Sequence, residues 1–164
     1  MPWTISRPTL DDLDEMGRVH VQVWQEAYAG LMPADYLSGL DPTRAPVSWR
    51  ARMHDDSEVT WWIARDEGGI VGMTTSGPPR DDDAPTPLEL YAINVLRRAY
   101  GSGLADALLA RAIGDDPAYL WVLDGNERAI AYYRKRGFVD EGGRKPEPAT
   151  GVTEIRMARG LTDT

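Results

Sequence analysis

Two glycines at a strand-to-helix junction are the residues of this sequence best suited to bind an anion. The apolar run Leu88 to Val95 leads through Tyr100 into a glycine-containing turn and then into an amphipathic helix. Such a junction leaves backbone N–H groups unpaired at the positive end of the helix dipole, where phosphate oxygens bind. Glycine also allows a bulky anion to approach the backbone closely. The amides predicted to bind a phosphate-bearing ligand are those of Gly101, Ser102, Gly103, Leu104 and Ala105.

Two familiar phosphate-binding motifs do not fit this junction. A dinucleotide fingerprint requires G-x-G-x-x-G, but Asp106 stands where the third glycine is needed. A P-loop requires a Gly-Lys pair, and the chain contains none. The anion is therefore expected to be held in another way.

A second segment, Asn126 to Phe138, follows the next predicted strand and favours a helix that begins at Asn126 and ends at Gly137. Together, the two segments resemble the GNAT superfamily of acyl-CoA-dependent N-acetyltransferases. That family carries Q/R-x-x-G-x-G/A at the start of one helix and N-x-x-A-x-x-(F/Y)-Y-(E/R)-K-x-G-F at the next. The second pattern is matched at Asn126, Ala129, Tyr132, Tyr133, Lys135, Gly137 and Phe138. The first is matched at Gly103 and Ala105, with Tyr100 in place of the usual Gln or Arg.

The resemblance implies one GNAT domain over residues 1–164, of the α/β class. Its expected sheet is mixed, mostly antiparallel and twisted, with six to seven strands and helices on both faces. Periodicity and turn residues predict strands at 4–7, 59–64, 69–75, 88–95, 119–123, 138–141 and 152–158. Helices are predicted over about 10–29, 34–38, 103–113 and 127–136, and over parts of 42–53, where Pro46 is expected to interrupt the helix.

The resemblance also implies acetyl-CoA as co-substrate. The main chain near Ile93, Asn94 and Val95 would pair with the pantetheine arm, and the Val95 amide would bind the thioester carbonyl. Tyr133 would contact the donor and protonate the leaving thiolate as general acid. The residues expected to bind the donor are Ile93, Asn94, Val95, Tyr100, Gly101, Ser102, Gly103, Leu104, Ala105, Asn126 and Tyr133.

Glu89 is the first candidate for deprotonating or binding the acceptor amine, because a charged side chain in an otherwise apolar strand is expected to serve a function. Strict alternation along the strand would place it on the same face as Ile93 and Val95; solvation at the strand start is the alternative. His20 and water are the other candidate bases. Trp24 and Tyr28 share one helical stripe with His20 and are predicted to line the acceptor pocket or, alternatively, the core.

Other aromatic and acidic residues are harder to place. Trp121 lies in a predicted buried strand and is expected in the core. Asp81, Asp82 and Asp83 precede the strand 88–95, on a loop that either steers a cationic amine to the site or is simply solvated.

Composition limits the possible functions. With 164 residues and a net charge of −8, the chain is not expected to bind nucleic acid. No cysteine is present and the two histidines are far apart, so no metal site is predicted. No membrane span or signal peptide is recognised, so a cytoplasmic protein is expected.

The predicted function is acetyl transfer from acetyl-CoA to a primary amine of a small molecule or peptide, by direct attack in a ternary complex. The alternatives left open are a catalytically silent acyl-CoA sensor of the same fold, O-acetylation, and a longer acyl donor. A homodimer is a family expectation only.

Overall fold

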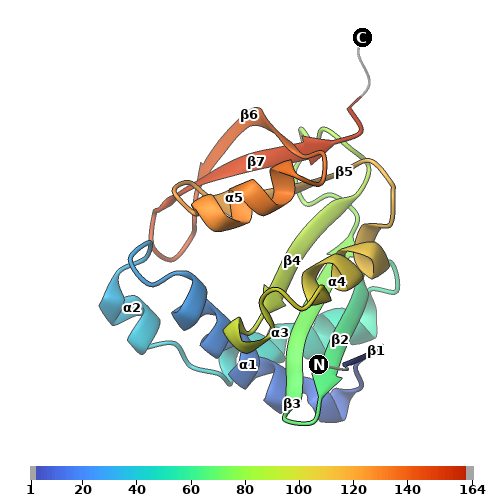
Figure 1. Cartoon of the computed structure of the whole chain (residues 1–164), viewed down its shortest axis with the longest axis vertical. Coiled ribbons are helices and arrows are strands. Elements are labelled where there is room, and N and C mark those ends of the chain that lie inside the picture. The colour runs from blue at the N-terminus through green and yellow to red at the C-terminus, as the bar shows by residue number, and fades with distance from the viewer. Residues whose placement is uncertain (1–2, 162–164) are drawn as a thin grey trace.

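The computed structural model describes residues 3–161, which form one seven-stranded sheet flanked by helices (Figure 1). The strands are β1 (Thr4–Ser6), β2 (Thr60–Asp66), β3 (Gly69–Gly77), β4 (Glu89–Val95), β5 (Ala118–Leu123), β6 (Val139–Pro146) and β7 (Thr153–Arg159). The helices are α1 (Leu13–Ala27), α2 (Ala34–Ser38), α3 (Arg44–Asp55), α4 (Leu104–Ile113) and α5 (Glu127–Arg134). Short 3₁₀ turns cover Leu10–Asp12 and Arg97–Ala99.

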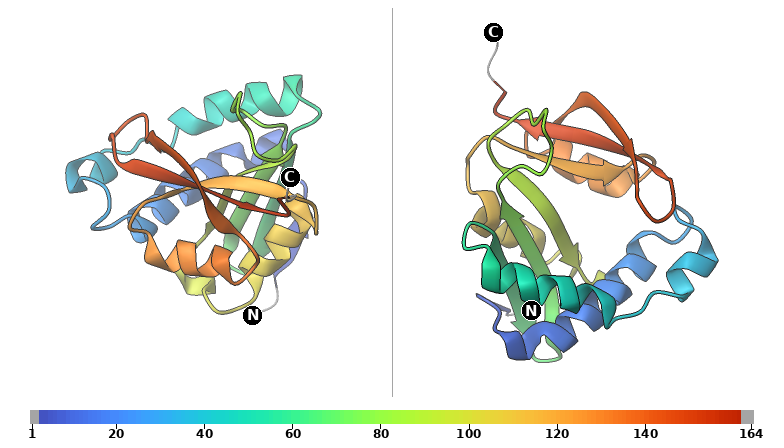
Figure 2. Two further views of the ribbon diagram at one scale, coloured as in Figure 1. Left: turned by 90° about the horizontal axis from the view of Figure 1, so that it is seen from above. Right: turned by 180° about the vertical axis from the view of Figure 1, so that it is seen from behind.

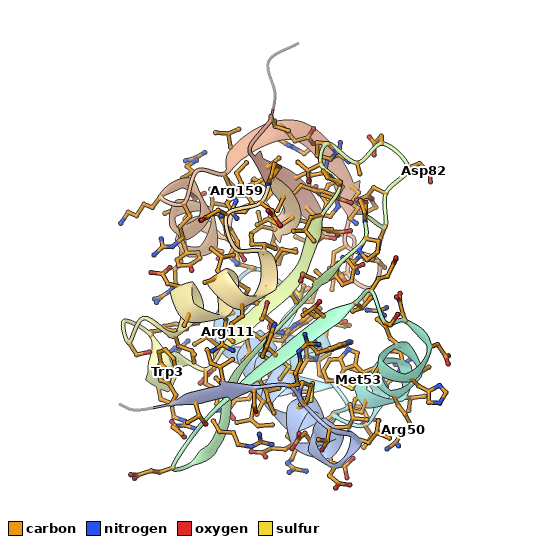
Figure 3. The ribbon with its side chains drawn as sticks, turned by 90° about the vertical axis from the view of Figure 1, so that its right-hand side faces the viewer. Trp3, Arg50, Met53, Asp82, Arg111 and Arg159 are labelled. Carbon is orange, nitrogen blue, oxygen red and sulfur yellow. The ribbon has the colours of Figure 1, made fainter. Side chains whose placement is uncertain are left out.

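The strands follow the order β1-β2-β3-β4-β5-β7-β6. Only β4 and β5 are parallel neighbours; the other adjacent pairs of the described chain are antiparallel. Helices α1 and α3 lie on one side of the sheet and α4 on the other, as Figures 2 and 3 show. The predicted mixed, mostly antiparallel α/β sheet with helices on both faces is confirmed. Within residues 3–161, no helix combines the length and apolarity needed to cross a bilayer.

The helix α4 packs on the sheet through the apolar stripe that its sequence predicts. Leu104, Leu108, Leu109, Ala112 and Ile113 are all buried. Burying these side chains at spacings of three and four residues fixes the rotation of the helix. The N-terminus of α4 is thereby held beside the end of β4 (Figure 1).

The helix α3 runs through Pro46 without a break, which corrects the predicted interruption. Pro46 is the third residue of the helix, and the first-turn N–H groups have no intrahelical acceptor in any case. Losing an N–H at this position therefore costs no helical hydrogen bond.

The strands β4 and β5 separate soon after they meet. Within the described chain, their ladder consists of the single pair Glu89–Tyr119. On the other side of β4, a bulge interrupts the pairing with β3: Leu90 is opposite Ser76 and Ala92 is opposite Thr75, so Tyr91 is an extra residue. The separated strands leave one backbone edge of β4 without a neighbouring strand beyond residue 89.

Candidate active site

A cavity of about 780 Å³ lies where β4 and β5 diverge. One part of its wall is the turn before α4 together with one face of α5, and the other part comes from α1, β5, the residue after β6 and the start of β7. Residues 91–95 of β4 run between these two parts. We call the first part the turn end of the cavity and the second part the far end.

The turn end presents unpaired backbone amides. Gly101 and Gly103 have φ values of +77° and +85°, and a Cβ atom at either would meet no atom within 4 Å. Among residues 3–161, no acceptor is found for the amides of Gly101, Gly103, Ala105 and Asp106. These amides begin a ten-residue helix, so open space, donor groups and helix dipole together suit an anion such as a pyrophosphate.

Two of the predicted amides, those of Ser102 and Leu104, are already used within the turn, which corrects their assignment, and so is the amide of Tyr100. The Tyr100 amide donates to the Arg97 carbonyl at 3.0 Å, and the Ser102 amide donates to the Ala99 carbonyl at 3.2 Å. Ser102 does not line the cavity, and its hydroxyl lies 3.3 Å from the Leu104 amide. Tyr100 still lines the cavity through its side chain.

Three arginines line the turn end, but two of them are paired. Arg97 donates to the Glu26 carbonyl at 2.9 Å, and Arg136 forms an ion pair with Asp106. Arg128 has no carboxylate partner within the described chain; its guanidinium lies 3.7 Å from the centre of the Tyr100 ring. Sequence spacing alone does not place Arg128 at this site, because its stacking partner Tyr100 is 28 residues away in the sequence.

The free edge of β4 presents two of the three predicted backbone positions to the cavity. The Leu96 amide donates to the Val71 carbonyl on β3 at 3.0 Å. Because backbone groups of successive residues point to opposite sides of a strand, Val95 and Ile93 direct theirs away from β3, toward the cavity. The main-chain groups of Asn94 therefore face β3, and Asn94 lines the cavity without offering them.

Tyr133 lies at the middle of the cavity wall. Asn126 caps α5 by accepting a hydrogen bond from the Ala129 amide at 3.3 Å, and Tyr133 packs against the Phe138 ring at 5.7 Å between centroids. Burial and the nearby Tyr28 raise the pKa of the Tyr133 phenol, so it stays protonated at neutral pH. Asn126 also lines the cavity, so it both caps the helix and reaches the predicted site.

The aromatic stripe of α1 forms part of the far end. His20, Trp24 and Tyr28 all line the cavity, and their rings contact one another in sequence at 5.1 Å between centroids. Burial lowers the pKa of His20 to about 4, so its ring is neutral at pH 7. The predicted position of Trp24 and Tyr28 at a pocket is what the structure shows; their contact with an acceptor stays a prediction.

An acetyltransferase (GNAT) family model matches residues 23–138, which include β4, the turn before α4 and Tyr133. The chain belongs to the GNAT family. A relative from Bacillus subtilis, the uncharacterized N-acetyltransferase YuaI, is 30% identical over 136 residues, or 79% of this chain and 76% of that protein. A probable N-acetyltransferase of Mycobacterium tuberculosis is 29% identical over 138 residues, covering 80% and 76% of the two chains.

The fold comparison agrees with the family assignment. The PaiA N-acetyltransferase of Thermoplasma acidophilum, solved in complex with coenzyme A, has a TM-score of 0.73 at 15% identity. The match covers 97% of this chain and 99% of that one. This GNAT protein therefore shares its whole architecture with a known acetyltransferase structure.

Glu89 is the main departure from the predicted GNAT site. It is 1% exposed and does not line the cavity. Its carboxylate forms an ion pair with Arg80 at 2.7 Å and lies 3.0 Å from the Tyr119 hydroxyl, whose single proton it shares with Asp81. The bulge at Tyr91 breaks the alternation that would have placed Glu89 beside Ile93 and Val95. The structure thus has Glu89 anchoring the loop before β4, outside the cavity in which a base or an amine ligand would act.

The acidic loop before β4 is likewise tied to the sheet. Asp81 accepts hydrogen bonds from the Tyr119 hydroxyl and the Trp121 indole, both at 2.8 Å, and Asp83 pairs with Arg156 at 2.8 Å. Asp82 is exposed at the outer end of the loop (Figure 3). Two of the three aspartates therefore have structural partners.

Three residues of the far end are not predicted as site residues by the sequence. Trp121 was expected in the core but lines the cavity, as do Glu147 and Glu154. The two glutamates lie just after β6 and at the start of β7, where a sequence pattern shows only an ordinary hairpin. Within residues 3–161, no group of three or more His, Asp or Glu side chains is arranged to hold a metal ion.

Proposed function

We propose that this protein transfers the acetyl group of acetyl-CoA to a primary amine by direct attack in a ternary complex. The observation that carries the proposal is one continuous cavity that joins three features: the free amides before α4, the free edge of β4 and the Tyr133 side chain. Each feature suits a different part of the donor.

The free amides of Gly101, Gly103 and Ala105 would bind the pyrophosphate, as a helix N-terminus does for phosphate. The main-chain groups of Ile93 and Val95 would pair with the amides of the pantetheine arm in the manner of an added strand. Bound acetyl-CoA supplies an activated thioester to the middle of the cavity.

At that point, two groups of the protein assist the reaction. The Val95 N–H would donate to the thioester oxygen as it gains negative charge during attack by the amine nitrogen. When the carbon–sulfur bond breaks, the Tyr133 hydroxyl would give its proton to the departing thiolate. The phenolate would then take up the second proton of the attacking nitrogen, which must lose it to become the amide. Tyr133 suits this task because its raised pKa keeps it protonated at neutral pH.

The attacking amine must first lose a proton, and we propose that water accepts it. Glu89 does not reach the cavity, and His20 holds protons poorly with a pKa of about 4. The expected rate therefore rises with pH until the pKa of the acceptor amine itself is reached.

The first experiment is thermal unfolding with acetyl-CoA, with NADH and ATP as controls, followed by measurement of CoA release from an amine library. At a ligand concentration near 100 times Kd, binding adds roughly 2.7 kcal/mol to the free energy of unfolding. For a chain of this size, the melting temperature should rise by on the order of 5–10 °C. No shift with any acyl-CoA would contradict the proposal.

A further inference from the structure

The far end of the cavity contains a carboxylate without a partner. Glu154 is half-buried, lines the cavity, and forms no hydrogen bond or ion pair with any other side chain among residues 3–161. Its pKa is raised chiefly by burial; the charge of Lys145 opposes this effect and the neighbouring Glu147 adds to it. Desolvating a charge is unfavourable unless something pairs with it, so this carboxylate is suited to receive a cation from outside the protein.

Glu147 adds a second negative charge at the same place. One of its carboxylate oxygens holds the β6–β7 turn by accepting from the Thr150 amide at 2.7 Å and the Thr150 hydroxyl at 2.6 Å. The other oxygen has no partner within the described residues, and Glu147 also lines the cavity. The residue is therefore fixed in position while part of its charge stays available.

The cations near Glu154 do not neutralise it by direct contact. Lys145 lies opposite Glu154 in the β6–β7 ladder, and its amine rests 4.3 Å from the centre of the Trp121 ring. Arg80 is paired with Glu89, and Asp81 adds a negative charge from the same loop. Neither Lys145 nor Arg80 lines the cavity. Glu26 of α1 does, but its carboxylate accepts a hydrogen bond from the Arg97 amide at 3.0 Å. Glu154 is therefore the carboxylate of the far end with both oxygens unpaired among residues 3–161, and the neighbouring Glu147 has one oxygen unpaired.

Tyr28 is a neighbour both of Tyr133 and of the two glutamates, and all four residues line the same cavity. Burial and the charges of Glu154 and Glu147 raise the pKa of Tyr28 to about 12. Burial and Tyr28 in turn raise the pKa of Tyr133, where the acetyl group is proposed to be transferred.

The walls of the far end suit an aliphatic cation. Trp24, Tyr28 and Trp121 present aromatic rings, and Met32 adds a flexible apolar surface. Aromatic faces attract alkylammonium groups and also cover the methylene groups between two charges.

We infer that the acceptor carries a second positive group, bound by Glu154 and Glu147, so that the substrate class is an aliphatic diamine or a longer polyamine. This inference rests on the proposed function, because it assumes that the reacting amine lies beside Tyr133. One ammonium group would bind at the glutamates while the other end of the chain presents its nitrogen to the thioester. An amine with a carboxylate in the second position would be repelled by the same pair.

A binding experiment tests this class without requiring turnover. The protein is saturated with CoA and titrated calorimetrically with diamines of four to six carbons, with the monoamines of the same lengths, and with the matching ω-amino acids. The best diamine should bind about ten- to a hundredfold more tightly than its monoamine, as expected for a hydrogen-bonded charge pair. The ω-amino acid should bind more weakly than either.

Two variants test whether Glu154 causes the preference for the diamine. Glu154→Gln should abolish the preference for the diamine, and the control Glu67→Gln, an exposed residue of the β2–β3 turn, should retain it. Thermal unfolding verifies that both variants are folded. Equal affinity for monoamine and diamine, no binding of any amine, or an unchanged preference in Glu154→Gln would each overturn the inference.

Release of CoA from acetyl-CoA separates this inference from the proposed function. A diamine preference in binding that Glu154→Gln removes, without CoA release by any amine, would support the inference and contradict the transfer reaction. Equal rates of CoA release with monoamines, diamines and ω-amino acids would support transfer and overturn the diamine class.

Discussion

Tyr133 is held by the same contacts that adjust its chemistry. Its ring packs against Phe138 and Tyr132, and burial among these groups favours the neutral phenol. Because packing fixes its ring, Tyr133 can donate a proton but has little freedom to move and contact another part of acetyl-CoA. Its role in transfer and its role in donor binding can therefore be separated by removing only the hydroxyl.

We expect Tyr133→Phe to lower kcat by about 10²–10⁴-fold, the usual contribution of a general acid. The acetyl-CoA shift in melting temperature should be retained, since the phenyl ring keeps the packing. Steady-state CoA release and thermal unfolding measure the two effects. Tyr132→Phe is the matched control, because that hydroxyl bonds Asp106 at 2.8 Å. An unchanged kcat in Tyr133→Phe would contradict the assignment of Tyr133 as general acid. A catalytically silent acyl-CoA sensor would show no turnover in the parent protein or in the variant.

His20 makes the stability of the protein dependent on pH. Its pKa is about 4 when folded, against an ordinary value of 6.5, so the unfolded chain binds the proton more readily. The free energy of unfolding should therefore fall as the pH drops from about 6.5 to about 4, by about 2–3 kcal/mol from this residue. Denaturant unfolding at pH 7.5 and 4.5 measures the loss, and His20→Phe should reduce it by that amount. The exposed His54→Asn is the control; an equal loss in His20→Phe would show that other groups cause it.

Among the elements, β4 has different partners at its two ends. At its start, Glu89 binds Arg80 and Tyr119 and so joins β4 to the preceding loop and to β5. At its other end, the strand lies beside the cavity. The start of β4 is thus a fixed point from which the free edge extends.

Glu89→Gln tests whether this residue is an anchor or a base. Loss of the charge leaves Arg80 without its partner, and because the Arg80 side chain is 48% exposed, we expect a cost of about 2–4 kcal/mol in unfolding free energy. The kcat of the folded variant should stay within about twofold of the parent, whereas loss of a general base would lower it about 10²-fold or more. A large fall in kcat with full stability would restore Glu89 as a catalytic candidate.

The turn before α4 depends on Gly103 for two separate reasons. Its φ of +85° is costly for any residue with a Cβ, so Gly103→Ala should lose about 1–2 kcal/mol of stability. The added methyl group would also occupy space that we assign to the pyrophosphate, so the acetyl-CoA shift should shrink. Gly142→Ala, at φ +106° with similarly open surroundings, should lose comparable stability and keep the full shift. Equal shifts in both variants would mean that the anion does not bind at this turn.

For the whole molecule, the features that the sequence predicts are the ones with local causes. The positions of the strands along the chain, the apolar stripe of α4 and the glycine turn all depend on residues within about ten positions of one another. Glu89 was placed wrongly because the bulge at Tyr91 arises from pairing with β3, which alternation within one strand does not reveal. Glu154 was missed because the residues that make it unusual, Tyr28 and Trp121, are distant in sequence.

The single backbone pair between β4 and β5 has a consequence for how the molecule unfolds. One half of the sheet is β1–β4 and the other is β5–β7, and Glu89–Tyr119 is the ladder pair that joins them within residues 3–161. Without a ligand, we expect the two halves to open as separate cooperative units, so that hydrogen exchange gives them different opening free energies.

A donor that pairs with the edge of β4 and contacts α5 would bridge the two halves. Exchange protection should then rise throughout β5 and β7, including their residues that do not line the cavity, and the two opening free energies should converge. Protection confined to the turn before α4 would contradict this. The bound coenzyme would thus take the place of a strand beside β4. Occupancy of the site would decide whether the protein unfolds as two cooperative units or as one.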